Sequence, residues 1–143
     1  MVTNLAAWHR RVELCIKIIK MYNVDQAVAI VIMFNTLNIE PIENMLSDNV
    51  IFLSDWVLSP IIGREAVLDF LENKLDTMFD CVQEGNCGYY ARLIKIEVEY
   101  PNEYLVELAY YFDDEEGRIL MQIQADQNGL INSIRFIDRV NDN

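Results

Sequence analysis

Apolar residues recur every three or four positions over residues 4–22, which predicts an amphipathic helix. The apolar arc of this helix is wide, so we expect it to be buried against the domain or against another chain. A basic helix that carries a tryptophan could instead lie on a membrane surface, which is the alternative interpretation. Residues 25–36 are apolar on nearly every side and predict a central, buried helix, although their β-branched residues would also suit a strand.

The middle of the chain changes from a helical to a strand pattern. Asn38 can cap a short helix that ends near Leu46, and Pro41 fits the first turn because its missing N–H costs little there. Residues 50–58 then alternate as a strand. One side of this strand carries Val50, Phe52, Ser54 and Trp56, and the other carries Ile51, Leu53, Asp55 and Val57.

A further helix and a run of strands complete the pattern. Gly63 precedes an amphipathic helix over 64–79, whose buried face is expected to carry Val67, Phe70, Leu71, Leu75 and Met78. Period-two alternation predicts strands over residues 89–100, 103–112, 118–126 and 130–139. Asn128-Gly129 indicates a hairpin between the last two strands. Alternation places Arg92 on the face that carries Ile94, Ile96 and Val98. The expected outer positions of the sheet are Ala109, Tyr111, Leu120, Gln122, Gln124, Ile131, Ser133 and Ile137.

Length and charge narrow the class of protein. The 143 residues suit one domain, and no linker rich in Gly, Pro or Ser divides them. The net charge of −12 disfavours nucleic-acid binding, because phosphates would be repelled. No apolar run is long enough to span a bilayer, and the first residues lack the pattern of a secretory signal. The acidic residues between 97 and 116 predict a solvated face or, alternatively, a patch for a basic partner.

The cysteines and the single histidine limit the chemistry. Cys15, Cys81 and Cys87 are odd in number, which argues against a disulfide framework and is typical of a reducing compartment, so we expect a cytoplasmic protein. The spacing of Cys81 and Cys87 does not suit a zinc knuckle. One histidine, His9, makes a catalytic triad or a histidine-rich metal site improbable. We therefore expect no metal and no cofactor.

The order of the predicted elements, three helices, a strand, a helix and a four-stranded meander, resembles the nuclear transport factor 2-like superfamily. This superfamily includes polyketide cyclase-like and ketosteroid isomerase-like proteins. The most specific match is MLSDNVIFLSDWVLSPIIGREAVLDFL, residues 45–71, where an acidic turn, a strand, a glycine and a helix follow one another. The resemblance covers about residues 24–139, so residues 1–22 are interpreted as an N-terminal extension and 23–143 as the domain.

The resemblance implies an α+β fold in which helices pack on a curved, mainly antiparallel sheet, the cystatin-like cone. It also implies a pocket between the helices and the concave sheet face, and homodimers through the outer face. In the ketosteroid isomerase-like branch, the proton-shuttling aspartate lies nine residues before the glycine, which here is Ser54. A serine hydroxyl is too weak a base for that role. Asp55 lies next to it but faces the other way unless a β-bulge turns it, so Asp55 is a weak catalytic candidate.

The remaining pocket candidates point to binding rather than catalysis. Arg92 could anchor an acidic ligand, or it could reach solvent or an acidic neighbour from a strand end. Trp56, Tyr110 and Phe112 could line the pocket with Ser54, or simply pack in the core. The leading hypothesis is a non-catalytic homodimer that binds a small apolar or amphipathic ligand, or a protein partner. The alternatives are a small-molecule isomerase, cyclase or hydrolase that uses a pocket carboxylate, and an interaction protein that acts through helix 4–22 and the acidic face.

Overall fold

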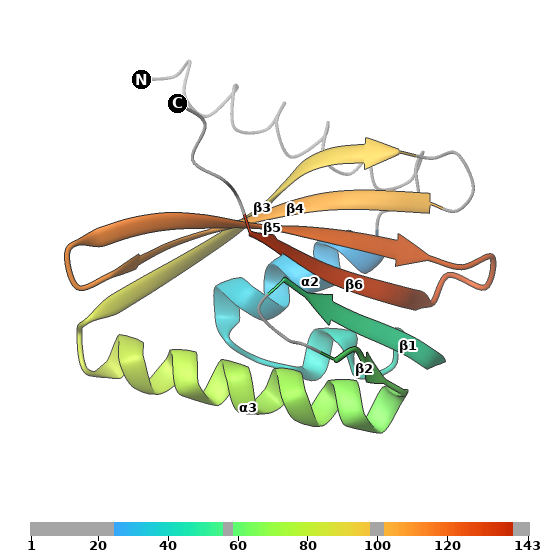
Figure 1. Cartoon of the computed structure of the whole chain (residues 1–143), viewed down its shortest axis with the longest axis horizontal. Helices are drawn as coiled ribbons and strands as arrows, with labels where there is room; N and C mark the ends of the chain where they lie inside the picture. Colours follow the sequence, from blue (N-terminus) through green and yellow to red (C-terminus); the bar gives the residue numbers. More distant parts are fainter. Residues whose placement is uncertain (1–24, 56–58, 98–101, 139–143) are drawn as a thin grey trace, which may run out of the picture.

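A curved six-stranded sheet with helices on one face forms the part of the chain that the computed structural model describes, residues 25–55, 59–97 and 102–138 (Figure 1). The elements in chain order are α2 (Asp25–Thr36), the 3-10 helix η1 (Glu40–Ile42), β1 (Leu46–Ser54), β2 (Ile61–Ile62), α3 (Arg64–Gln83), β3 (Cys87–Glu97), β4 (Asn102–Phe112), β5 (Glu115–Ala125) and β6 (Ile131–Asp138). The predicted α+β class is confirmed. The predicted helix 4–22 and Trp56 lie outside the described residues.

The sheet is mainly antiparallel, with the strand order β2-β1-β6-β5-β4-β3. One neighbouring pair, β1 and β6, runs parallel. Helices α2 and α3 cover the same face of the sheet, where α2 contacts β3 and β4, and α3 contacts β1, β2 and β3 (Figure 1). The core lies between these two layers, because the inward positions of the strands alternate with polar outward ones. Its largest buried side chains are Tyr104, Phe34, Phe52, Phe136, Ile30, Met33, Ile42, Leu71, Leu75, Leu108, Met121 and Ile123.

Helix α2 is the predicted central helix, with the bounds that the sequence indicated. Most of its surface is buried, and Ile32 is the large apolar side chain that stays exposed. Gln26 is buried near its start, where its side-chain N–H donates to the Gly129 carbonyl (2.6 Å). Near its end, Asn35 pairs with strand β3 by accepting from the Ala91 N–H (2.7 Å) and donating to the Ala91 carbonyl (3.0 Å). This side chain satisfies backbone groups at the edge of the sheet.

The segment between α2 and β1 differs from the prediction. The expected helix to Leu46 is only the short η1, and Asn38 accepts from the Glu40 N–H (3.0 Å) at its start. Strand β1 begins at Leu46 instead of Val50. Parallel pairing with β6 extends β1 toward its N-terminal end. The pairing begins at Leu46, opposite Ile131, and continues from Ile51 after a register shift between Leu46 and Ile51. Tertiary pairing therefore overrides the local helical pattern.

Helix α3 begins where the sequence placed it and runs four residues further, to Gln83. Gly63 precedes it with a φ of 101°, a conformation that side chains with a Cβ rarely adopt. Four of the five predicted inward residues are buried, namely Val67, Leu71, Leu75 and Met78, and Phe70 is partly buried. The amphipathic prediction for this helix is confirmed.

A β-bulge in β3 reverses the predicted facing of Arg92. Leu93 pairs with Val106 and Lys95 with Leu105, so Ile94 is the extra residue of the bulge. Arg92 therefore shares a face with Lys95, on the outer side of the sheet, and not with the inward residues further along the strand. The prediction that Arg92 faces inward is wrong for this reason. The outward placement of Ile131 is also wrong, because Ile131 is fully buried in the core.

Two of the three hairpins of the meander, β4–β5 and β5–β6, have loops that lie wholly within the described residues. β4 and β5 are joined by Asp113 and Asp114, so the polar stretch that separated the predicted strands is largely strand. The predicted Asn128-Gly129 hairpin between β5 and β6 is confirmed, with Gly129 at a φ of 77°. The Asp126 carboxylate accepts from the backbone N–H groups of Asn128 (2.9 Å) and Leu130 (3.0 Å). This side chain stabilises the turn together with the backbone bonds from Asp126 N–H to the Leu130 carbonyl (2.8 Å) and from Gly129 N–H to the Asp126 carbonyl (3.1 Å).

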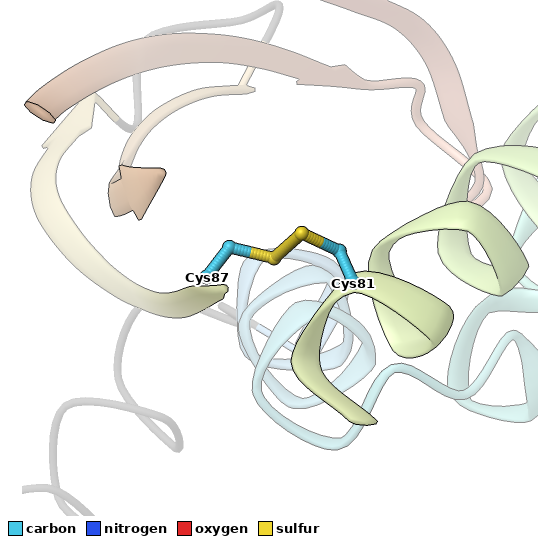
Figure 2. Close-up of a disulfide and its surroundings, with 2 residues drawn as sticks. All are labelled: Cys81 and Cys87. Atoms are coloured by element: carbon cyan, nitrogen blue, oxygen red, sulfur yellow. A yellow bond between two sulfur atoms is a disulfide. The ribbon is translucent and has the colours of Figure 1, made fainter. Parts of the chain in front are cut away.

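A disulfide between Cys81 and Cys87 joins the last turn of α3 to the start of β3 (Figure 2). Its Cα atoms lie 5.8 Å apart, within the usual range for a bridge. The odd cysteine count, which argued against a disulfide framework, does not prevent this single bridge, since two of the three cysteines pair and Cys15 lies outside the described residues. Because disulfides persist mainly in oxidising compartments, this bridge does not support the reducing compartment that the count suggested.

No helix among the described residues combines the length and the apolar character that crossing a bilayer requires.

Candidate functional site

Ser54, the last residue of strand β1, and Asp55, the turn residue after it, lie on opposite faces, as alternation predicted. Ser54 lies two residues after the buried Phe52 and pairs in register with Phe136, so it belongs to the concave face. The Asp55 carboxylate is substantially exposed and lies 3.9 Å from the Arg135 guanidinium, whose side chain is also about half exposed. The bulge of β1 lies before Ile51, so it does not turn Asp55 inward. This placement does not favour Asp55 as a base for a ligand on the concave face.

Arg92 is held on the outer face by a buried carboxylate. Glu107 is only 3% exposed, and its Oε1 accepts from Arg92 Nε (3.1 Å) and lies 3.0 Å from Arg92 Nη2. Arg118 Nη1 lies 3.8 Å from the other oxygen of Glu107. A buried carboxylate needs such partners, because an unpaired charge away from water is costly. This cluster of Arg92, Glu107 and Arg118 therefore has a structural explanation, and it does not present Arg92 to the concave face.

The two described aromatic candidates differ in position. Tyr110 shares the inward face of β4 with Leu108 and is partly buried, with its ring over Gly117, where a Cβ would clash with it. Phe112 is half exposed beside the β4–β5 turn. Tyr110 therefore stays a candidate for the wall of a concave site, and Phe112 does not lie among the buried residues.

An aromatic cluster links both helices to the sheet on the concave side. The Phe52 ring lies 4.8 Å from Phe70 of α3 and 4.9 Å from Phe136 of β6, and Phe34 of α2 lies 6.1 Å from Phe136. These separations are typical of favourable edge-to-face and tilted ring pairs. Phe70 is the member of the cluster that keeps partial exposure.

Lys74 adds a cation to this cluster. Its Nζ lies 5.7 Å from the centre of the Phe136 ring, within the range of a cation–π contact. Among the described residues, no carboxylate forms an ion pair with this ammonium group. Burial lowers the pKa of Lys74, because the charged form loses hydration. Lys74 is thus a partly buried positive charge on the concave side that no carboxylate of the described residues neutralises.

Sequence reasoning missed Lys74, although a signal for it was present. Lys74 lies seven residues after Val67, four after Phe70 and four before Met78, so it falls on the apolar face of α3. A lysine on the inward face of an amphipathic helix calls for an explanation, because such a charge is rarely buried unless paired. The residues that gather at the candidate site are therefore Lys74, Phe70, Phe136 and Ser54.

A second, smaller feature lies on the outer face. A cavity of about 110 Å³ is lined by Lys95, Glu103, Tyr104, Leu105 and Gln122. The Gln122 amide donates to the Glu103 carboxylate across neighbouring strands. This cavity spans the neighbouring strands β3, β4 and β5, and it is separate from the concave aromatic cluster.

No family model and no curated protein sequence matches the chain. Solved structures do match it. An uncharacterised protein with a cystatin-like fold from Silicibacter pomeroyi has a TM-score of 0.62 at 15% identity, over 85% of this chain and 77% of that one. A steroid delta-isomerase from Pseudomonas aeruginosa has a TM-score of 0.60 at 13% identity, over 82% and 81%.

A third match is a LEH-like epoxide hydrolase of M. tuberculosis, with a TM-score of 0.56 at 14% identity over 81% of this chain and 78% of that one. An NTF2-like protein of unknown function from Cytophaga hutchinsonii and a de novo designed protein with a curved β-sheet also match. At these identities the likeness shows the fold alone. The helices on a curved open sheet, together with these neighbours, show that the chain has the fold of the nuclear transport factor 2-like superfamily.

Proposed function

We propose that the chain binds a small amphipathic anion on the concave side of the sheet, beside Lys74, without transforming it. The observation that carries this proposal is the Lys74 ammonium group, which lies over the Phe136 ring with no carboxylate partner among the described residues. Partial burial of an uncompensated charge is unfavourable, and an anion bound beside it would relieve that cost. Ligand sites commonly combine apolar walls with a few polar groups that fix orientation.

The chemistry of the surroundings favours a ligand with an apolar body. Phe70 is partly exposed beside the buried Phe52 and Phe136, so an aromatic or branched aliphatic group would find flat apolar contacts there. Ser54 adds a hydroxyl on the same face, next to Phe136 in the parallel pair. We infer a ligand such as an aryl or branched alkyl carboxylate, with its charged group toward Lys74.

Thermal unfolding with matched ligand pairs tests this function. Phenylacetate, phenylpropionate and cyclohexanecarboxylate are compared with their neutral amides, and the carboxylates are expected to raise Tm while the amides do not. A ligand at one hundred times its Kd stabilises the native state by about 2.7 kcal/mol. Lys74→Met should abolish the shift, whereas Lys95→Met on the outer face should keep it. Equal shifts for carboxylates and amides, or equal shifts in both variants, would contradict the role of Lys74.

We also propose that the protein forms a homodimer through the outer sheet face. Support comes from exposed apolar side chains on the β3–β4 side of the sheet, with Tyr90 at 62% exposure and Ile94 at 41%, next to the paired charges of Arg92 and Glu107. Exposed aromatic and apolar groups beside a polar rim are typical of such interfaces. Sedimentation of the wild type and of Tyr90→Glu tests the proposal. A dimer that Tyr90→Glu converts to a folded monomer supports it, and a wild-type monomer at high concentration contradicts it.

The alternative function is an enzyme such as an isomerase, cyclase or hydrolase. It is favoured by the names of two structural neighbours, a steroid delta-isomerase and an epoxide hydrolase. The carboxylate that such chemistry would use is Asp55, which here lies beside Arg135. Turnover of a steroid enone or an epoxide that Asp55→Asn abolishes would support the enzyme. Turnover that Asp55→Asn leaves unchanged would exclude Asp55 from it.

A further inference from the structure

The side of helix α2 that faces away from the core is apolar as well. Val28 and Val31 are only partly buried and Ile32 is 45% exposed, and their spacing places them on one side of the helix. Asn35 continues this stripe, and its amide is already bonded to the Ala91 backbone of β3. A helix that is apolar on all sides is normally buried on all sides, so we expect this stripe to be covered.

We propose that residues 4–22, which lie outside the described residues, form a helix that packs antiparallel to α2 along this stripe. Only Asn23 and Val24 link the segment to Asp25, the first residue of α2. A connection this short joins helices that are antiparallel neighbours. At 1.5 Å per residue, a helix over 4–22 would be about 28 Å long and α2 is about 18 Å long, so the segment can cover the whole stripe.

The apolar residues of the two segments lie at matching distances from the connection 23–24. Cys15 lies eight residues before the connection and Ile32 lies eight residues after it. Ile19 and Val28 lie four residues from it on either side. In an antiparallel pair of helices, positions at equal distances from the connection stand side by side. Cys15 and Ile19 are four residues apart, on the predicted apolar arc, so they would face the stripe of α2 together.

Charge also favours docking of the segment on its own chain. Residues 1–22 contain four of the eleven basic residues, Arg10, Arg11, Lys17 and Lys20, and one of the 23 acidic residues, Glu13. The remainder of the chain is therefore strongly acidic, and it attracts a basic segment. The covalent link adds a high effective concentration of the segment at the stripe, which a separate partner lacks.

Thiol labelling of the full chain tests the docking, because Cys15 is the one cysteine outside the Cys81–Cys87 bridge. Alkylation of Cys15 by iodoacetamide, followed by mass spectrometry, should be at least about tenfold slower in the folded protein than in urea. Ile32→Glu places a charge in the stripe and should restore most of the labelling rate. Ile62→Glu is the matched control, since Ile62 is 66% exposed on β2, and it should keep Cys15 protected. Equal labelling rates in the wild type and in Ile32→Glu overturn the inference.

The inference is independent of the proposed ligand site. That site uses the opposite side of α2, where Phe34 lies 6.1 Å from Phe136 in the aromatic cluster. Failure of carboxylates to raise Tm would leave the docking of residues 4–22 intact, and the reverse also holds.

A cross-link locates the segment without adding a charge to the stripe. Under mild oxidation with diamide, the new thiol of Ile32→Cys should form a disulfide with Cys15 of the same chain, whereas the thiol of Ile62→Cys should not. Peptide mass spectrometry identifies the bridge, and non-reducing electrophoresis separates bridges within a chain from bridges between chains. A bridge found only between chains would place the segment on a second copy and overturn the inference. Protection of Cys15 that appears only with anionic lipid vesicles would place it on a membrane and overturn it as well.

Discussion

The contact between Lys74 and Phe136 can be measured directly by a double-mutant cycle. Phe136→Leu removes the ring and its contacts with Phe52 (4.9 Å) and Phe34 (6.1 Å) while keeping an apolar side chain. Each aromatic pair contributes about 0.5–1.5 kcal/mol beyond the area it buries, so we expect this change to cost roughly 1–3 kcal/mol. Lys74→Met keeps the apolar stem and removes the charge.

The coupling between the two changes isolates the cation–π contact. Such contacts contribute about 0.5–1 kcal/mol at exposed sites and about 2 kcal/mol when desolvated, so a partly buried pair should lie between these values. The double mutant should accordingly lose less stability than the sum of the single mutants, by about 0.5–2 kcal/mol. Urea unfolding followed by circular dichroism gives the four free energies of unfolding.

A matched cycle shows whether the coupling belongs to this pair. Lys95 lies on the outer face, so Lys95→Met combined with Phe136→Leu should be additive to within about 0.5 kcal/mol. If Lys74→Met and Phe136→Leu are also additive within that limit, the two side chains are not in contact and the geometry of the candidate site is refuted. A large coupling in both cycles would instead mean that Phe136→Leu changes the sheet as a whole.

The other predictions concern pH, the disulfide and one turn. The pKa of Lys74 is lowered in the folded state, so the unfolded chain binds more protons between that pKa and 10.5. The free energy of unfolding should therefore rise with pH in this window in the wild type, and it should rise less in Lys74→Met. Urea unfolding midpoints at several pH values measure both slopes. A slope that Lys74→Met leaves unchanged would contradict the burial of this charge. The Cys81–Cys87 bridge closes a loop with a sequence separation of 6, so Cys81→Ala with Cys87→Ala should cost about 2 kcal/mol, and dithiothreitol should lower Tm in the wild type alone. Gly63→Ala should lower the free energy of unfolding by about 1–3 kcal/mol because Gly63 has a positive φ, although there is open space for a Cβ atom. An unchanged urea midpoint would contradict this prediction and show that the backbone relaxes freely.

Local patterns were sufficient for most of the fold. The period of 3.6 located α2 and α3, the glycine and asparagine signals located the turns, and alternation located the meander. The start of β1 could not be found this way, because it depends on pairing with β6, a partner about 80 residues away in the chain. The helix α3 was predicted to end too early. Its last turns contain exposed residues such as Phe79 and Val82, so the helical spacing of buried apolar residues does not continue there.

The candidate site was harder to predict than the fold. One extra residue at Ile94 moved Arg92 to the outer face, and period-two alternation carries no sign of a bulge. Lys74 is recognisable in the sequence as a charged residue on an apolar helix face. Its role in the candidate site depends on its contact with the Phe136 ring, and the sequence alone does not predict that these two residues lie close together. The disulfide was missed because a count of cysteines does not say which pair lies close together.

The hydrogen bond between Gln26 and Gly129 has a consequence for how the chain folds. It joins residues 103 positions apart, and the parallel pairing of β1 with β6 spans a similar length of chain. The hairpins β3–β4 and β4–β5, in contrast, need only short loops to close. Closing a long loop costs more conformational entropy than closing a short one, and this cost precedes the favourable energy of the distant contacts. We therefore expect the meander to form first and the pairing of β1 with β6 to form late. Folding speed should therefore respond more to the separation of α2 from β6 along the chain than to the strength of any single core contact.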